Sequence, residues 1–289
     1  MDRLKRPARI IGTVVGVLVM AAILIGILNA LVADGKWTLG WSDYSYDDSL
    51  YQVGDGSIPA DQLTSVDIDW IDGTVTLTSC KDSYVSLTES SESELPESAV
   101  VRWYVDENGA LSIKYRNSSF FLGASKNKNK NLVVRIPEKY LENLKITVEG
   151  VSTNFIFSNL KADRVEASTK LGGISVLSDC AFTHFTGSVE NERLQVRGMI
   201  DYLDLTSKGG EIVLEQLGDD TEIQTESGSI RLNLEEDASF SLDFETEKGR
   251  YVSDFVLTEE NGYLVCGDGE RELEVETESG TLYLKRKQD

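Results

Sequence analysis

Hydrophobic and polar positions alternate with a period of two along much of the second half of the chain. Ile230, Leu232 and Leu234 show this alternation plainly, with polar residues between them. Such a pattern is typical of short strands that bury one face. Pro137 is the last of the four prolines, so no proline interrupts strand pairing beyond it. The pattern predicts an all-β body.

A second pattern repeats at a longer interval. A hydroxyl residue precedes a glycine, or once an asparagine, by three positions, and the motif recurs about every 20 residues. The pairs are Thr147/Gly150, Thr169/Gly172, Ser188/Asn191, Thr206/Gly209, Thr225/Gly228, Thr246/Gly249 and Thr277/Gly280. Asparagine fits the series because it tolerates a left-handed backbone better than other residues with a Cβ.

Short strands and a glycine corner at a regular interval predict a β-solenoid in which each coil stacks on its predecessor. Stacking would align the hydroxyl residues in one column. The alternative is a series of antiparallel hairpins, because a glycine turn between alternating runs is also a hairpin signal. The regular interval favours the solenoid.

The N-terminal part has a different pattern. Residues 10–32 form an uncharged apolar run, long enough as a helix of roughly 34 Å to cross a membrane. Four basic residues precede it: Arg3, Lys5, Arg6 and Arg9. This asymmetry predicts a cytoplasmic N-terminus and an extracellular remainder. A cleaved signal peptide is the alternative, but it usually has a shorter apolar core and a small-x-small cleavage site. Gly12 and Gly16 form a GxxxG pair that permits self-association of the helix.

These patterns predict four parts. They are a cytoplasmic N-terminus (1–9), a transmembrane helix (10–32), an extracellular linker (33–62) and a β-solenoid domain (63–289). Whether residues 63–140 and 141–289 form one continuous solenoid or two packed units stays open at this point.

Composition narrows the function. The chain carries 28 basic and 49 acidic residues, and the part beyond residue 33 has a net charge near −24, which repels nucleic acid. Three widely spaced cysteines favour neither a disulfide framework nor a thiolate metal site. His184 is the only histidine, so the chain lacks a zinc cluster of histidines, and no nucleotide-binding or nucleophile motif is present. We therefore expect no enzymatic activity, cofactor or metal.

One segment departs from the acidic character. Lys126, Lys128 and Lys130 alternate with asparagines after an apolar triplet. Such a loop can contact an anionic polymer, such as teichoic acid, or the membrane surface. The alternative is a solvated hairpin loop without a ligand.

Three stretches resemble a known family: Asp67 to Leu77, Arg135-Ile-Pro137, and Ile223 to Leu232. They are similar to the bacterial "putative adhesin" domain of unknown function, over about residues 63–287. The resemblance implies a right-handed β-solenoid, commonly membrane-anchored in Gram-positive bacteria and associated with cell-envelope genes. It implies no established enzymatic activity and provides no catalytic residues.

Two functions remain after the sequence analysis. The first is a non-enzymatic, membrane-anchored cell-surface module that binds a cell-wall polymer or an envelope protein. The second is an accessory sensor of cell-envelope stress that signals to other membrane proteins through its single helix.

Overall fold

The computed structural model describes residues 46–92, 94–116 and 130–287. The predicted transmembrane run, residues 10–32, lies outside these ranges, so the prediction stays untested. Within the described ranges, no helix is both long enough and apolar enough to span a bilayer.

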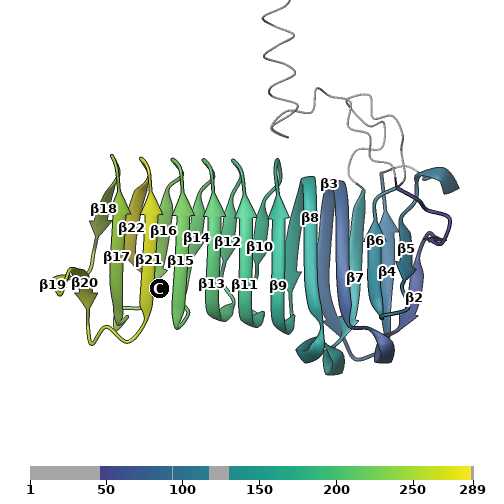
Figure 1. Cartoon of the computed structure of the whole chain (residues 1–289), viewed down its shortest axis with the longest axis horizontal. Coiled ribbons are helices and arrows are strands. Elements are labelled where there is room, and N and C mark those ends of the chain that lie inside the picture. Colours follow the sequence, from purple (N-terminus) through teal and green to yellow (C-terminus); the bar gives the residue numbers. More distant parts are fainter. Residues whose placement is uncertain (1–45, 93, 117–129, 288–289) are drawn as a thin grey trace, which may run out of the picture. The chain divides into compact units, whose positions relative to one another are not determined.

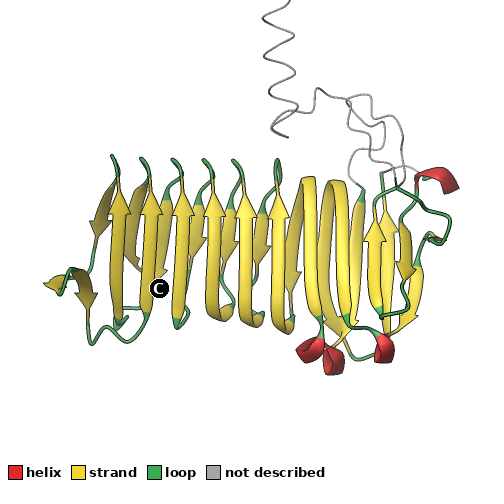
Figure 2. Cartoon of the chain, viewed as in Figure 1, coloured by secondary structure: helices red, strands yellow, loops and turns green. Residues whose placement is uncertain are grey.

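The described residues form an all-β solenoid (Figures 1 and 2). It is a row of coils, and a typical coil contributes one strand to each of two faces. The long-strand face contains β9 (Lys161–Thr169), β11 (Ala181–Val189), β13 (Met199–Ser207), β15 (Asp220–Thr225), β21 (Glu272–Thr277) and β17 (Phe240–Thr246). The short-strand face contains β10 (Ile174–Val176), β12 (Leu194–Val196), β14 (Ile212–Leu214), β16 (Ile230–Leu234), β22 (Thr281–Arg286) and β18 (Arg250–Ser253).

Neighbouring coils pair in parallel and in register. On the long-strand face, His184 pairs with Arg164 on one side and with Tyr202 on the other. Parallel pairing between coils confirms the solenoid and excludes the series of hairpins. The period-two alternation is confirmed as well, because residues such as Ile230 and Leu232 point inward and are fully buried between the two faces.

The last coil in the sequence is not the last coil in space. β21 pairs with β15 on one side and β17 on the other, and β22 lies in the same way between β16 and β18. The expectation that each coil stacks on its predecessor is therefore wrong at this end. After β16 the chain skips one coil position, forms β17 and β18, makes the hairpin of β19 (Thr258–Glu260) and β20 (Tyr263–Cys266), and then fills the gap.

The N-terminal end is closed by antiparallel strands. β3 (Ser65–Cys80) spans a whole coil, with β8 (Lys145–Ser158) on one side and β6 (Ala110–Lys114) and β7 (Asn131–Pro137) on the other. Outside them lie β4 (Tyr84–Ser90), β5 (Arg102–Val105), β1 (Gln52–Val53) and β2 (Gly56–Pro59). Short 3-10 helices occupy Ala60–Gln62 (η1), Glu97–Ala99 (η2) and Glu138–Asn143 (η3).

This arrangement settles one open question and corrects one boundary. Because β3 pairs with β8 along most of its length, residues 63–140 and 141–289 belong to one continuous stack. Residues 33–62 were expected to be a linker, yet β1 and β2 pair with β5 and β4. The folded body therefore begins at least as early as Gln52.

The predicted hydroxyl column exists, but with a corrected register. We call it the corner column, and its members pair in succession: Thr169, Val189, Ser207, Thr225, Thr277 and Thr246. Four predicted positions lie in it. Ser188 and Thr206 instead precede the column by one residue, and Thr147 pairs with Glu166, so these three assignments are wrong.

Three threonines of the corner column, Thr225, Thr246 and Thr277, accept a hydrogen bond from the glycine of their own corner. The Gly228 amide donates to Thr225 Oγ1 at 3.0 Å, and the same bond links Gly280 to Thr277 at 2.7 Å. The following glycines are needed for space. A Cβ on Gly210 would collide with the carbonyl oxygen of Glu192 in the coil before it.

Candidate binding groove

A groove of about 380 Å³ crosses the corners of successive coils on the long-strand face. It runs over β11, β13, β15 and β21, which are neighbours in the stack. The lining residues are Ser188, Val189, Glu190, Thr206, Ser207, Lys208, Gln224, Thr225, Glu226, Glu276 and Glu278. Val189, Ser207 and Thr225 belong to the corner column, so the groove follows the corners of these coils.

The groove floor is a regular series of polar groups. Ser188 pairs with Thr206, Thr206 with Gln224, and Gln224 with Glu276. Neighbouring strands lie about 4.8 Å apart, so the series offers a hydrogen-bonding group at that interval. Ser188 and Thr206 are short, which leaves a hollow at their end of the series. A polymer laid along the stack would meet a polar side chain at each of these four coils.

The groove is acidic. It contains four glutamates and one lysine, and the Lys208 ammonium lies 3.0 Å from Glu190. Three carboxylates, those of Glu226, Glu276 and Glu278, remain beyond this pair. A negative groove repels anionic polymers and accepts neutral or cationic ones.

Beside the groove lies a further line of carboxylates, which we call the acidic row. Asp204, Glu222, Glu274 and Asp243 pair in succession across four coils. Desolvation and the charges of Glu222 and Asp243 raise the pKa of Glu274 above its usual value. Carboxylates thus lie side by side on neighbouring coils along this row.

On the short-strand face, basic side chains pair with the acidic ones. Glu211 lies between Arg193 and Arg231 from the coils on either side, at 3.4 and 3.5 Å. Lys285 and Asp254 form another pair at 2.9 Å. The two faces therefore differ in electrostatic character, and excess negative charge gathers on the face that carries the groove.

Of the three lysines predicted to contact a polymer or a membrane, the structure describes only Lys130. Lys126 and Lys128 lie outside the described residues, so their role stays a prediction. Lys130 is described and is fully buried. Its ammonium therefore does not reach the surface, and the expectation that Lys130 contacts a polymer or a membrane is wrong.

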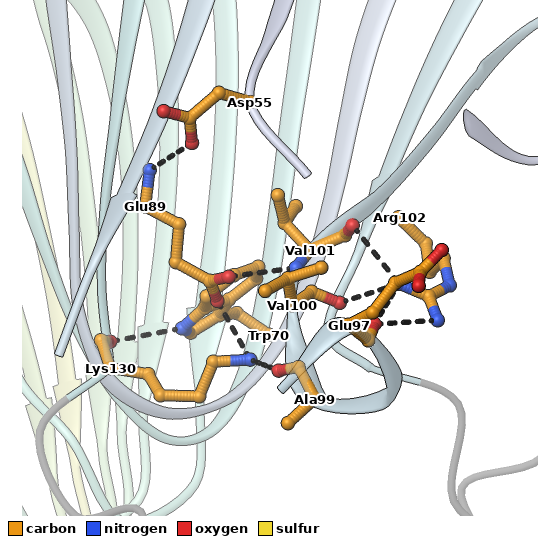
Figure 3. Close-up of polar contacts among 9 residues, drawn as sticks. All are labelled: Asp55, Trp70, Glu89, Glu97, Ala99, Val100, Val101, Arg102 and Lys130. Carbon is orange, nitrogen blue, oxygen red and sulfur yellow. Dashed lines mark hydrogen bonds and ion pairs between the residues drawn. The ribbon is translucent and has the colours of Figure 1, made fainter. Parts of the chain in front are cut away.

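Lys130 instead closes the N-terminal cap from inside (Figure 3). Its Nζ lies 2.7 Å from Glu89 Oε1, donates to the Ala99 carbonyl at 2.6 Å, and lies 4.0 Å from the centre of the Tyr115 ring. The Trp70 indole donates to the Lys130 carbonyl at 3.4 Å. Burial lowers the pKa of Lys130, and the charge of Glu89 opposes this shift. The sequence showed only an alternation of lysine and asparagine, which does not distinguish a buried lysine from its exposed neighbours.

The histidine and the three cysteines lie in the described part of the solenoid. His184 is partly exposed and stacks on Tyr202 with ring centres 4.8 Å apart. Cys180 and Cys266 are buried free thiols, and burial raises the pKa of Cys180 to about 11. In the described part of the chain, no group of three or more histidine, cysteine or acidic side chains is arranged to hold a metal ion.

Known proteins resemble this chain mainly in fold. No curated protein matches it. A solved adhesin described as putative from Bacteroides fragilis NCTC 9343 superimposes with a TM-score of 0.50 and 14% identity, over 80% of this chain and 96% of that one. A cell adhesion protein, also described as putative, from Clostridium sporogenes ATCC 15579 gives a TM-score of 0.38 and 12% identity, over 82% of this chain and 100% of that one.

The family comparison is more specific. The Toastrack DUF4097 family matches residues 63–216 and again residues 178–285. The two matches overlap and together cover most of the coils, as expected for a body built from repeated units. The chain therefore belongs to the Toastrack DUF4097 family.

Proposed function

We propose that this chain is a non-enzymatic binding module on the outer surface of a bacterial cell membrane. Residues 10–32 would anchor it, with residues 1–9 in the cytoplasm and the solenoid outside. The uncharged apolar run and its basic N-terminal flank support this orientation. The adhesin description of the Bacteroides fragilis structure agrees with a surface role.

The groove supports a ligand class. We infer a neutral or amine-bearing polymer of the cell wall, because the floor repeats a hydrogen-bonding group at every coil and the surrounding charge is negative. The single observation that carries this proposal is the register of Ser188, Thr206 and Gln224 across adjacent coils. A repeating chain of hydroxyl-rich sugars matches a repeating floor better than a compact ligand does.

Binding of defined polymers tests the proposal. The full chain in lipid nanodiscs would be exposed to a soluble polymer of N-acetylglucosamine, to its deacetylated cationic form, and to poly(glycerol phosphate). We expect the first two to bind and the third to bind more weakly at low salt. Preference for the polyanion would contradict the groove as the binding site. If that preference disappeared in a Lys126→Ser/Lys128→Ser variant, the lysine segment would be the contact instead.

A pair of substitutions locates the site. Thr206→Trp fills the groove floor and should reduce binding of the N-acetylglucosamine polymer about tenfold or more. Ser175→Trp, on β10 of the short-strand face, is the matched control and should bind as the wild type does. Equal binding by both variants would show that the polymer attaches elsewhere.

A further inference from the structure

The C-terminal end of the solenoid is open. Its outermost coil consists of β17 and β18, and among the described strands β18 pairs with β22 alone. β20 covers only Phe240–Leu242 of β17. The N-terminal end differs, because antiparallel strands cover it on both faces. An open strand edge is a template for pairing with another chain.

Apolar side chains surround this edge. The rings of Phe244 in β17 and Tyr251 in β18 contact each other with centres 5.8 Å apart. Tyr251 is 42% exposed and Val252 38% exposed. Solenoids normally need a polar cap on their terminal coil. The β19–β20 hairpin leaves these side chains partly uncovered.

The backbone of β18 is oriented for pairing. The amides of Arg250 and Asp254 donate inward, to Gly280 and Leu284 of the neighbouring coil. Because backbone groups alternate along a strand, those of Tyr251 and Ser253 point outward. The outward groups have the spacing that an added antiparallel strand requires.

We propose that a second copy of this chain fills the open end, with the two β18 strands pairing antiparallel about a two-fold axis at Val252. In this register Tyr251 lies opposite Ser253 of the other copy, and their outward backbone groups bond. Arg250 then lies opposite Asp254. Arg250 forms no ion pair within the described part of its own chain, while Asp254 binds Lys285 at 2.9 Å. The charges of the strand are therefore complementary to those of its own copy.

The symmetry limits the assembly to two copies. The same surface is used by both partners, so the contact closes on itself. The capped N-terminal ends lie away from the contact and present different strands. The proposal thus gives a dimer with the two caps at opposite ends.

One feature opposes the contact and supplies a test. β20 occupies the outer edge of β17 at Phe240–Leu242, so the same axis brings only the following part of β17, with Asp243 and Glu245, towards its copy. These carboxylates repel across the axis, which weakens association. Neutralising them by Asp243→Asn and Glu245→Gln should tighten the dimer.

Disulfide trapping in the full chain tests the register. In the proposed dimer, Val252 lies opposite itself at a position without backbone bonds, where Cα atoms are closest. Val252→Cys should therefore give a disulfide-linked dimer on non-reducing electrophoresis under mild oxidation. Tyr283→Cys is the matched control, because Tyr283 pairs with Val252 but lies one coil inward. The unmodified chain reports any background from its native cysteines.

Charge exchange provides an independent criterion. Arg250→Glu and Asp254→Arg should each reduce the yield of the Val252→Cys dimer about tenfold, and the two together should restore much of it. A Val252→Cys yield no higher than that of Tyr283→Cys would overturn the proposal, as would the absence of rescue. Polymer binding in the groove is measured separately, so either proposal can fail without the other.

Discussion

Lys130 and Glu89 form an ion pair of 2.7 Å, and their side chains are 0% and 3% exposed. Glu89 lies in β4 of the N-terminal cap, and Lys130 immediately precedes β7. Glu89 also accepts the Val101 amide at 2.8 Å, so one carboxylate joins three segments of the cap.

Removing one partner of this pair should destabilise the protein strongly. Lys130→Ala or Glu89→Ala leaves an uncompensated buried charge, which costs about 3–5 kcal/mol. The double variant Lys130→Met/Glu89→Leu should lose much less, because no charge stays buried. Urea unfolding followed by tryptophan fluorescence measures the free energy of unfolding. Lys145→Ala, which removes an exposed partner of Glu166, should cost under about 1 kcal/mol.

The pair also makes stability depend on pH. The folded state lowers the pKa of Lys130 below its ordinary value of 10.5, so the unfolded chain binds the proton more tightly. Stability therefore rises as the pH increases through the folded pKa towards 10.5, and falls as the ammonium regains its proton. As the pH rises through this range, the free energy of unfolding of the wild type should increase relative to that of Lys130→Met/Glu89→Leu. A constant difference between the two unfolding free energies would contradict the assignment.

Two adjacent glycines test the corrected register of the corners. Gly210→Ala should destabilise the fold by about 2–3 kcal/mol, because its Cβ meets the backbone of the preceding coil. Gly209→Ala should cost under about 1 kcal/mol, since its nearest neighbour is the Asn191 side chain at 3.1 Å. Thermal unfolding of the two variants compares them directly. The opposite order would restore the register that pairs Thr206 with Gly209.

The interleaved C-terminal coil predicts an unusual response to truncation. Ending the chain after Arg271 removes β21 and β22, which leaves β17 and β18 without their only parallel neighbours. We expect residues 235–271 to become sensitive to protease, while the coils up to β16 resist. Limited proteolysis with mass spectrometry should give the same core as a chain that ends after Leu234. Protection of β17 would mean that it can stack directly on β15.

An exchange of the predicted transmembrane helix tests the anchor prediction. If the chain acts as a binding module, exchanging residues 10–32 for an unrelated apolar helix of equal length should leave polymer binding in membranes unchanged. A sensor that signals through the helix should lose its cellular output in the same exchange. A reporter of envelope stress and a polymer pull-down, measured on the same strain, separate the two functions.

The sequence predicted the class of fold well, because alternation such as Ile230, Leu232 and Leu234 follows directly from burial of one strand face. The predicted register of the corners was wrong at three positions. Thr206 and Ser207 both lie three residues before a glycine, and only contact with the next coil decides which of them turns inward. Periodicity alone carries no information about that choice.

The order of the last coils, the groove and the burial of Lys130 could not be predicted from the sequence, because each depends on contacts between distant residues. The coil that contains Thr277 resembles those of Thr225 and Thr246, so nothing local shows that it lies between them. The groove was also missed, because its lining side chains come from separate coils. Lys130 was misplaced because its burial depends on Glu89, 41 positions earlier in the chain.

The order of the last coils has a consequence for how the protein is made. The coils from β8 to β16 can pair one after another in the order in which they are synthesised. The last coils cannot, since the gap beside β15 closes only when β21 and β22, which follow β17 and β18 in the chain, have been made and inserted. A molecule in which β21 and β22 have not yet reached their place therefore exposes the interior of its last coils to proteases.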